Sequence, residues 1–157
     1  MKYNVYFYNY PVGVLGIAEE SGAISKVFFY NEKSLAVYEK TETPLIKKAA
    51  SQLEEYFYSK RKNFDLPLKP EGTDFQLSVW NALQTIPFGE TRSYKDIAVQ
   101  IGNPKACRAV GMANNRNPIV IIIPCHRVIG NNGSLSGYGG GISVKKFLLD
   151  LERGINF

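Results

Sequence analysis

The sequence PIVIIIPCHRVI, at residues 118–129, joins an apolar run to a thiol and an imidazole. Five consecutive β-branched residues, Ile119 to Ile123, lie between Pro118 and Pro124. A run without polar alternation is typical of a strand that is buried on both faces. We therefore predict a short core strand that ends at Cys125 and His126.

Cys125 and His126 place a nucleophile beside the only histidine of the chain. The histidine is the side chain that titrates near neutral pH, and the cysteine is a potential nucleophile. Adjacent strand residues point to opposite faces, so the spacing alone does not establish a catalytic pair. Pro124 bends the path and allows a direct or water-mediated contact. The alternative is structural, with Cys125 as a small buried apolar residue and His126 as a satisfied polar residue.

Length and composition limit the fold and the kinds of site that the chain can build. With 157 residues the chain can hold one good core or two small ones. It has neither an apolar run of about 18 residues nor an N-terminal signal pattern, so we expect a soluble cytoplasmic protein without a membrane partner. Two cysteines and one histidine supply neither a disulfide framework nor a four-ligand zinc site. We expect no metal and no cofactor.

The positive charge of the chain is concentrated in one region. Residues 91–127 contain six basic residues and one acid, a surplus of five that equals the net charge of the whole chain. The six basic residues are Arg92, Lys95, Lys105, Arg108, Arg116 and Arg127. A local cationic field on an otherwise neutral body suits phosphate binding, although a solvated basic face is the alternative.

The first 70 residues predict an antiparallel sheet followed by a helix. β-prone runs at 5–8, 14–17 and 24–30 are separated by turn sequences. Thr43 is expected to cap a helix that begins at Pro44. The buried stripe of that helix is expected at Leu45, Ala49, Leu53 and Phe57. Residues 63–70 contain two prolines and predict an extended connector. No catalytic constellation precedes this connector, which indicates a scaffold or a partner surface.

Residues 71–157 predict a mainly helical unit. Thr73 to Gln76 form a capping box ahead of one helix, and Ser93 to Asp96 have the same spacing ahead of a second. Gly102 ends the second helix, and Asn103-Pro104 is expected to cap a third that runs to about Asn115. Two short helices around a tight glycine turn, the second one basic, are typical of a helix-turn-helix. The same arrangement also occurs in cores that bind no DNA.

The C-terminal segment predicts a turn at Asn131 to Gly133, a glycine-rich loop and a last helix. The loop, SGYGGG at residues 136–141, either lets a flat ligand approach the backbone or is simply flexible. Ser143 is expected to cap the helix and Gly154 to end it. Glu152 lies in the last turn, where an acid opposes the helix dipole and needs a partner. His126 is the only imidazole in the sequence that can be the partner of Glu152.

These motifs together resemble the O6-alkylguanine-DNA alkyltransferases, which repair DNA by direct reversal. The sequence PCHRV at residues 124–128, preceded by three isoleucines, is similar to the active-site motif of that family. The other shared segments follow in the family's order, namely Pro87 to Glu90, Ser93-Tyr94, Gly102 to Pro104, Arg108 to Gly111, Asn114, Asn117-Pro118, Gly137-Tyr138 and Leu148 to Glu152. The resemblance covers residues 73–152, and the first half shares only its layout of strands and a helix.

The resemblance implies an α+β protein in two parts. Residues 1–70 would form an N-terminal α/β domain, an antiparallel sheet with a helix in an RNase H-like layout that serves as a scaffold. Residues 71–157 would form a mainly α winged helix-turn-helix domain that carries the active site. The implied activity is irreversible, stoichiometric transfer of the alkyl group from O6-alkylguanine, and from O4-alkylthymine, in duplex DNA to Cys125. The damaged nucleotide would be flipped out by a monomer, with cooperative binding along DNA left open.

The resemblance also implies a role for single residues at the reacting centre. Cys125 would accept the alkyl group, His126 would act as its base through a water, and Glu152 would orient the histidine. Tyr94 would rotate the phosphate and later protonate the departing guanine. Asn117 would tie the DNA-binding helices to the active-site strand.

Further implied residues contact DNA or line the pocket. Arg108 would enter the duplex and hold the gap left by the flipped nucleotide. Other DNA contacts are implied for Ser93, Tyr94, Asn103, Lys105, Ala106 and Arg116. The pocket lining is implied for Met112, Pro124, Val128, Tyr138 and Gly139.

Two features depart from the family pattern, and two other functions remain open. The zinc ligands of some relatives are absent, since residues 1–75 contain neither Cys nor His. Cys107 has no role in the pattern.

A non-catalytic helix-turn-helix regulator would bind DNA sequence-specifically without a covalent adduct. A cysteine hydrolase built on Cys125 and His126 would turn over an ester or an amide.

Overall fold

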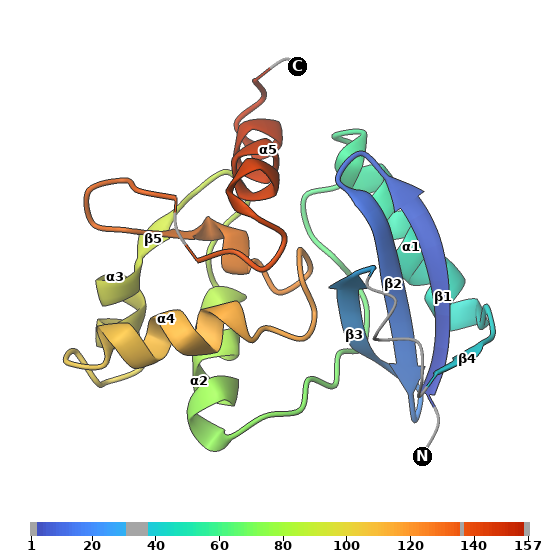
Figure 1. Ribbon diagram of the computed structural model, residues 1–157, viewed down its shortest axis with the longest axis horizontal. Helices are drawn as coiled ribbons and strands as arrows, with labels where there is room; N and C mark the ends of the chain where they lie inside the picture. The colour runs from blue at the N-terminus through green and yellow to red at the C-terminus, as the bar shows by residue number, and fades with distance from the viewer. Residues whose placement is uncertain (1–2, 31–37, 136, 156–157) are drawn as a thin grey trace. The chain divides into compact units, whose positions relative to one another are not determined.

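The computed structural model describes residues 3–30, 38–135 and 137–155, so Ser136 of the glycine-rich loop lies outside the described residues. The chain divides into two compact units, Met1–Glu71 and Gly72–Phe157. The first unit combines a sheet with a helix, and the second is mainly helical (Figure 1). The predicted α+β class is confirmed, and the winged form of the helix-turn-helix stays a prediction.

A four-stranded sheet is present among the described residues of the first unit. Strands β1 (Tyr3–Tyr10), β2 (Gly13–Glu20) and β3 (Ala23–Phe29) are antiparallel, as predicted. A further strand, β4 (Tyr38–Lys40), pairs in parallel with β1, which gives the order β3-β2-β1-β4. Three residues are too few to show an alternating pattern, so the sequence does not predict β4.

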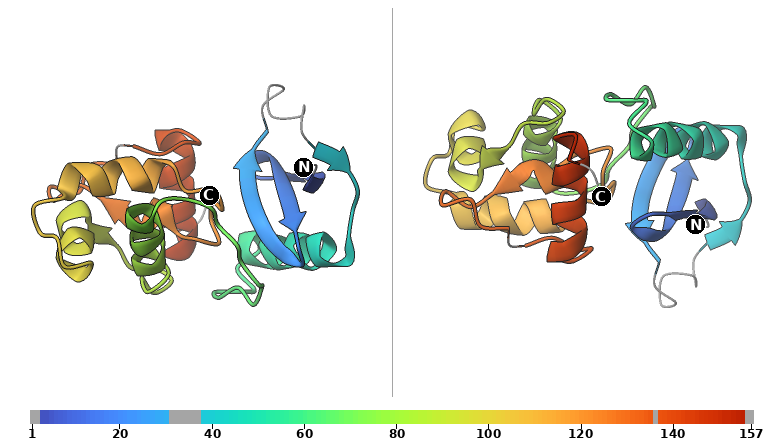
Figure 2. Two further views of the ribbon diagram at one scale, coloured as in Figure 1. Left: turned by 90° about the horizontal axis from the view of Figure 1, so that it is seen from below. Right: turned by 90° about the horizontal axis from the view of Figure 1, so that it is seen from above.

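Helix α1 (Pro44–Phe57) begins where the sequence predicts. The Thr43 hydroxyl accepts a hydrogen bond from the Ile46 amide at 3.1 Å, and Pro44 takes the first helical position. The helix packs against β1, β2 and β3 and lies along one face of the sheet (Figure 2). Ala49, Leu53 and Phe57 of the predicted stripe are buried, whereas Leu45 is half-buried.

The predicted connector at residues 63–70 is partly paired with the sheet. The Ile24 amide donates to the Pro67 carbonyl, and the Lys69 amide donates to the Ile24 carbonyl, both at 2.8 Å. Leu68 thereby forms an isolated parallel bridge with Ile24. Extended backbone before a proline has free hydrogen-bonding groups, which explains why it adds to the edge of β3.

The second unit is built from helices α2 (Asp74–Leu83), α3 (Tyr94–Gln100), α4 (Cys107–Asn115) and α5 (Ile142–Glu152). Both predicted capping boxes are present, at Thr73 with Gln76 and at Ser93 with Asp96. Helix α2 packs against α4, where the Trp80 indole donates to the Ala113 carbonyl at 2.9 Å. Two short strands, β5 (Arg92–Ser93) and β6 (Val128–Ile129), pair in parallel.

Two predicted helix starts are wrong. Helix α4 begins at Cys107 rather than after Asn103, because the Ala106 amide closes a turn onto the Asn103 carbonyl at 3.0 Å. Helix α5 begins at Ile142 rather than after Ser143, and its cap position is Gly141 with a φ of 97°. Glycine adopts this backbone conformation readily and ends the preceding loop without a side-chain cap.

The predicted core strand at residues 119–123 is also wrong. Ile119, Ile121, Ile122 and Ile123 are buried, but residues 120–122 form a turn in which Ile121 has a φ of 70°. Its amides bond locally, from Ile122 to the Val120 carbonyl at 2.8 Å and from Ile123 to the Ile119 carbonyl at 3.0 Å. An apolar run predicts burial reliably, but it does not determine how the backbone satisfies its hydrogen bonds.

In the described part of the chain, no helix combines the length and the apolar character needed to cross a membrane.

Candidate active site

Cys125 begins a single turn of 3-10 helix, η2 (Cys125–Arg127), that connects the buried isoleucine turn to β6. The side chains of Cys125 and His126 are buried, with relative exposures of 3% and 0%. A 3-10 helix has three residues per turn, so neighbouring side chains diverge by about 120° rather than by the roughly 180° of a strand. The structure therefore buries both the thiol and the imidazole in the interior of the second unit.

Two asparagine side chains hold the backbone on either side of Cys125. The Asn117 amide donates to the Ile123 carbonyl at 2.7 Å, and its oxygen accepts from the Ile119 amide at 3.0 Å. Asn117 thus closes both ends of the isoleucine turn with one side chain. From α4, the Asn114 amide donates to the Cys125 carbonyl at 3.2 Å.

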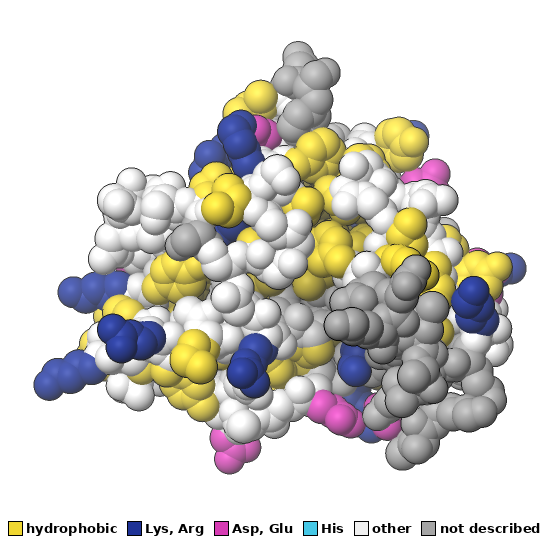
Figure 3. Space-filling model, viewed as in Figure 1, with side chains coloured by type: hydrophobic (Ala, Val, Ile, Leu, Met, Phe, Trp, Pro, Cys, Tyr) yellow, Lys and Arg dark blue, Asp and Glu magenta, His cyan; other side chains and the backbone are white. Residues whose placement is uncertain are grey.

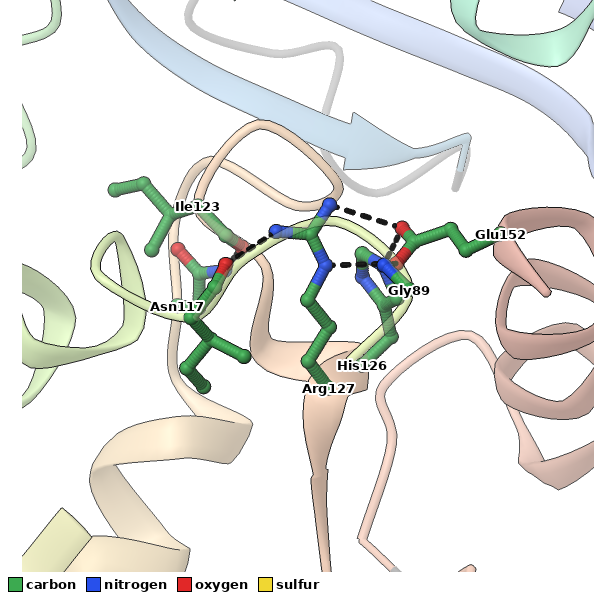
Figure 4. Close-up of polar contacts among 7 residues, drawn as sticks. Gly89, Asn117, Ile123, His126, Arg127 and Glu152 are labelled. Atoms are coloured by element: carbon green, nitrogen blue, oxygen red, sulfur yellow. Dashed lines mark hydrogen bonds and ion pairs between the residues drawn. The ribbon is translucent and has the colours of Figure 1, made fainter. Parts of the chain in front are cut away.

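The Glu152 carboxylate, at the end of α5, collects hydrogen bonds from three residues (Figure 4). His126 Nε2 lies 2.6 Å from Oε2, so the predicted contact between the acid and the histidine is present. Arg127 binds the same carboxylate through Nε at 2.8 Å and Nη2 at 3.1 Å. The Gly89 amide donates to Oε1 at 3.1 Å, and Arg127 Nη1 donates to the Ile86 carbonyl at 2.7 Å.

These contacts determine the charge of each member of the network. Burial alone would raise the pKa of Glu152, but the hydrogen bonds and charges of His126 and Arg127 hold that pKa well below its ordinary value. Burial lowers the pKa of His126 despite the neighbouring carboxylate. An ionised carboxylate only accepts, so His126 donates through Nε2 and keeps a lone pair on Nδ1. That buried Nδ1 has no hydrogen-bond partner among the described residues.

The Cys125 thiol is a poor acid where it lies. Burial raises its pKa to about 11, while a hydrogen bond from Asn117 and the charge of Lys145 lower it. Lys145 comes from α5 and is fully buried. A neutral base that follows a weakly acidic thiol in the sequence supplies the two groups that nucleophilic catalysis requires.

Four exposed cations of the second unit lie on and around α3 and α4. Lys95, Lys105, Arg108 and Arg116 are exposed, and Figure 3 shows Lys and Arg side chains over this part of the unit. Arg127 does not belong to this field, because it is buried and its charge is matched by Glu152. The surface charge is therefore smaller than the sequence count implies, but it remains clustered.

A groove of about 440 Å³ opens on the same helices. Its lining residues are Tyr94, Cys107, Arg108, Gly111, Met112, Asn115 and Gly137. Gly137 has a φ of 72°, and a Cβ there would lie 3.3 Å from the Tyr94 hydroxyl oxygen. The glycine keeps the space beside that hydroxyl open.

The other predicted residues separate into an inner and an outer group. Pro124, Val128 and Tyr138 are buried, and the Cys125 charge contributes to raising the pKa of Tyr138, after the larger effect of burial. Gly139 is exposed, and Met112 is 58% exposed in the groove. The outer predicted DNA contacts comprise exposed Asn103, Lys105 and Arg116 and half-buried Ser93 and Ala106.

Sequence reasoning missed three residues that shape this site. Arg127 was expected on the surface, yet it completes the Glu152 network. Lys145 lies seven residues before Glu152, a helical spacing of two turns that places both on one face of α5. That spacing is a signal in the sequence, whereas nothing in the sequence marks Gly89 as a donor to Glu152. The described residues contain no group of three or more His, Cys, Asp or Glu side chains that could hold a metal ion.

Comparison with protein families gives two matches that together cover all but six residues of the chain. The family described as 6-O-methylguanine DNA methyltransferase, ribonuclease-like domain, matches residues 1–70. The family described as 6-O-methylguanine DNA methyltransferase, DNA binding domain, matches residues 74–154.

Individual relatives match over nearly their whole length. The methylated-DNA–protein-cysteine methyltransferase of Methanosarcina acetivorans is 52% identical over 150 residues, covering 90% of this chain and 93% of the relative. The constitutive enzyme of Bacillus subtilis is 50% identical over 150 residues, covering 91% of each chain.

Solved structures agree in fold with the same group of proteins. The structure of Mycobacterium tuberculosis OGT in complex with DNA has a TM-score of 0.88 and 46% identity, covering 99% of this chain and 94% of that one. An O6-methylguanine DNA methyltransferase from Methanococcus jannaschii has a TM-score of 0.70 and 30% identity, covering 96% and 94%. The predicted resemblance is confirmed, and the chain belongs to the 6-O-methylguanine-DNA methyltransferase family.

Proposed function

We propose that this protein repairs alkylated DNA by direct reversal, with Cys125 as the acceptor of alkyl groups from O6 of guanine and O4 of thymine. The observation that carries the proposal is the buried set of Cys125, His126 and Glu152, in a unit with four exposed cations on and around α3 and α4. A thiol, an imidazole and an orienting carboxylate form a nucleophile-base set. Family membership supports the choice of substrate.

The reaction begins with the proton of Cys125. Burial holds the thiol pKa at about 11, so the thiolate is scarce until a base takes the proton. His126 is neutral, and its Nδ1 lone pair accepts that proton through one water molecule. Glu152 then stabilises the imidazolium, and Arg127 keeps Glu152 ionised.

The alkyl transfer is a displacement at carbon. The thiolate forms a bond to the alkyl carbon, the bond from that carbon to O6 breaks, and the electron pair stays on guanine. The guanine anion takes the hydroxyl proton of Tyr94, because developing charge in a dry pocket is stabilised by a positioned donor. A thioether has no easy hydrolytic route, so each protein molecule repairs one lesion.

Duplex DNA approaches the helices that carry the exposed cations. Arg108 occupies the gap left by the flipped nucleotide, and its exposed side chain beside the groove supports this role. Ser93, Asn103, Lys105, Ala106 and Arg116 contact the backbone on either side. Phosphate contacts and an inserted side chain offset the few kcal/mol that base flipping costs.

We also propose different roles for the two parts of the chain. Residues 71–157 bind DNA and carry the site as a winged helix-turn-helix domain, and residues 1–70 serve as a scaffold. The protein acts as a monomer and needs no cofactor. Cytoplasmic location is supported by two free cysteines, Cys107 and Cys125, because reduced thiols are typical of that compartment.

The test is the intact mass of the protein after incubation with a duplex that contains O6-methylguanine. We expect one added methyl group per molecule, located by peptide mapping on the segment that holds Cys125. Cys125→Ala should take up no methyl group, and Cys107→Ala, which removes the only other thiol of the chain, should still take up one. Methyl transfer that persists in Cys125→Ala contradicts the proposal.

The same experiment separates the alternative functions. A helix-turn-helix regulator would bind some duplexes orders of magnitude more tightly than others and would remain unmodified. A cysteine hydrolase would release product repeatedly from an ester or amide substrate, whereas the proposed reaction stops after one equivalent.

A further inference from the structure

Lys145 is a buried cation that the proposed reaction has not yet used. Its relative exposure is 0%, although lysine is almost never fully buried unless its charge is compensated. Burial lowers its pKa, and the neighbouring Cys125 raises it. An apolar side chain of similar length would fill the same space without the cost of removing an ammonium group from water.

The position of Lys145 connects the two chain segments that supply the reacting groups. Its Nζ donates to the Val128 carbonyl at 2.5 Å, three residues beyond Cys125 on the same segment. The same Nζ lies 5.9 Å from the centre of the Tyr94 ring. These segments also meet through the parallel pairing of β6 with β5, which directly precedes Tyr94.

The charges around the sulfur single out Lys145 as its source of positive charge. Arg127 is matched by the Glu152 carboxylate, and burial keeps His126 neutral before the reaction. Before the proton transfer, neither residue therefore supplies net positive charge at the sulfur. Lys145 does, and its charge lowers the pKa of Cys125 against the larger effect of burial.

We infer that Lys145 is a positioning residue for alkyl transfer, whose ammonium group holds the Val128 carbonyl and stabilises first the Cys125 thiolate and then the Tyr94 phenolate. This inference rests on the proposed function. The negative charge moves from sulfur to guanine as the S–C bond forms and the C–O6 bond breaks. It then moves to Tyr94 as the phenol proton passes to guanine, and Lys145 lies beside both ends of this path.

The first experiment measures the rate at which iodoacetamide alkylates Cys125 as a function of pH. All proteins carry Cys107→Ala, so that only one thiol reacts. Lys145→Gln keeps a donor for the Val128 carbonyl but removes the charge, and Lys145→Met removes both. Lys146→Met is the matched control, because Lys146 is the adjacent lysine, exposed and paired with Asp150 at 2.6 Å.

We expect both Lys145 variants to move the midpoint of alkylation to higher pH and the Lys146 control to leave it unchanged. A rise of one pKa unit lowers the rate near neutral pH about tenfold, because the thiolate fraction falls by that factor. A midpoint that Lys145→Gln leaves at the parental value would show a purely structural hydrogen bond and would overturn the inference. The other titratable and charged groups near this pair are Tyr94, His126, Arg127, Tyr138 and Glu152.

A second measurement decides the question if the Lys145 variants do not fold. Coupling between two sites is reciprocal, so a thiolate that is stabilised by Lys145 must raise the pKa of the lysine equally. NMR titration of the Lys145 ammonium should give a higher pKa in Cys125→Asp, whose carboxylate stands in for the thiolate charge, than in the neutral variant Cys125→Asn. Equal pKa values in the two proteins would overturn the inference.

The outcomes also separate this inference from the proposed function. Iodoacetamide needs neither DNA nor alkyl transfer to react with a thiolate. If the protein takes up no methyl group from O6-methylguanine but the midpoint follows the Lys145 charge, the proposed function fails while the electrostatic contact stands. If methyl transfer occurs and the midpoint of alkylation is the same with and without the Lys145 charge, the inference fails while the proposed function stands.

Discussion

Replacing Arg127 with methionine should destabilise the protein strongly, because it leaves the buried Glu152 carboxylate without its cationic partner. Arg127 and Glu152 have side-chain exposures of 7% and 1%. The substitution removes two hydrogen bonds to the Glu152 carboxylate, at 2.8 and 3.1 Å, and one to the Ile86 carbonyl, at 2.7 Å. Methionine fills much of the space, so the loss reports on charge and hydrogen bonding more than on packing.

The expected cost follows from the burial of the pair. Removing one partner of a buried ion pair costs about 3–5 kcal/mol, because the other charge is left uncompensated. For a chain of this length, each kcal/mol shifts Tm by about 2–4 °C, so Tm should fall by roughly 6–20 °C. In the double variant Arg127→Met with Glu152→Met, neither charge of the pair remains, and the total cost should be smaller than the sum of the two single variants.

The assay is urea unfolding at neutral pH, followed by tryptophan fluorescence and circular dichroism. Arg92→Met is the matched control, since Arg92 makes an ion pair of the same chemistry with Glu90 at 3.1 Å, but with side-chain exposures of 37% and 53%. The control should cost about 0–1 kcal/mol. A cost below about 1 kcal/mol for Arg127→Met, or strict additivity in the double variant, would refute the argument that the network is electrostatically coupled.

Three further predictions test other parts of the site. The pKa values of Glu152 and His126 are both lowered on folding, so the stability that they contribute is present above their ordinary pKa values of 4.5 and 6.5 and is lost as the pH falls below them. Acid titration of the unfolding free energy should show slopes of up to about 1.4 kcal/mol per pH unit for each group, and constant stability from pH 7 to pH 4 would contradict this. Tyr94→Phe and Arg108→Ala should have the same unfolding free energy as the parent but should repair O6-methylguanine more slowly. The loss of the proton donor in Tyr94→Phe should slow the reaction about 100-fold. A parental rate in single-turnover assays of either variant would rule out the role proposed for that residue. Asn117→Ala leaves the Ile119 amide and the Ile123 carbonyl without their partner and should cost about 2–4 kcal/mol in urea unfolding, a loss that Asn115→Ala on the exposed face of α4 should not reproduce.

The helix caps are predictable from sequence because their contacts are local. Thr43, Thr73 and Ser93 each bind an amide three residues ahead, so the whole interaction lies within one short window. The contact between His126 and Glu152 spans 26 residues. It is nevertheless predictable, because an acid at a helix C-terminus needs a partner and the chain offers a single imidazole.

The isoleucine turn shows where pattern reasoning stops. The sequence correctly marks residues 119–123 as interior, but a strand and a buried turn place the same side chains in the core. What distinguishes them is Asn117, whose side chain satisfies the backbone at both ends of the turn and so replaces a neighbouring strand. A propensity scale treats asparagine before proline only as a turn signal, without showing which distant carbonyl its amide will reach.

Arg127 and Lys145 escape prediction for a related reason. A lysine or arginine in a sequence is expected to lie on the surface, because burying its charge costs free energy unless an oppositely charged or hydrogen-bonding partner is present. In this protein the partners come from segments far along the chain, Glu152 for Arg127 and the Val128 carbonyl for Lys145. Sequence distance hides these contacts, although the spacing of Lys145 and Glu152 on α5 shows that one helix face carries both charges.

The side chains that hold the backbone around Cys125 are the same ones that act on its chemistry. Asn117 binds the Ile123 carbonyl and lowers the pKa of the thiol, and Lys145 binds the Val128 carbonyl and does the same by charge. Arg127 binds the Ile86 carbonyl and keeps Glu152 ionised. Because each side chain performs both tasks, its replacement changes stability and reactivity together. Only substitutions that keep the hydrogen bond and remove the charge, such as Lys145→Gln, can separate the two effects.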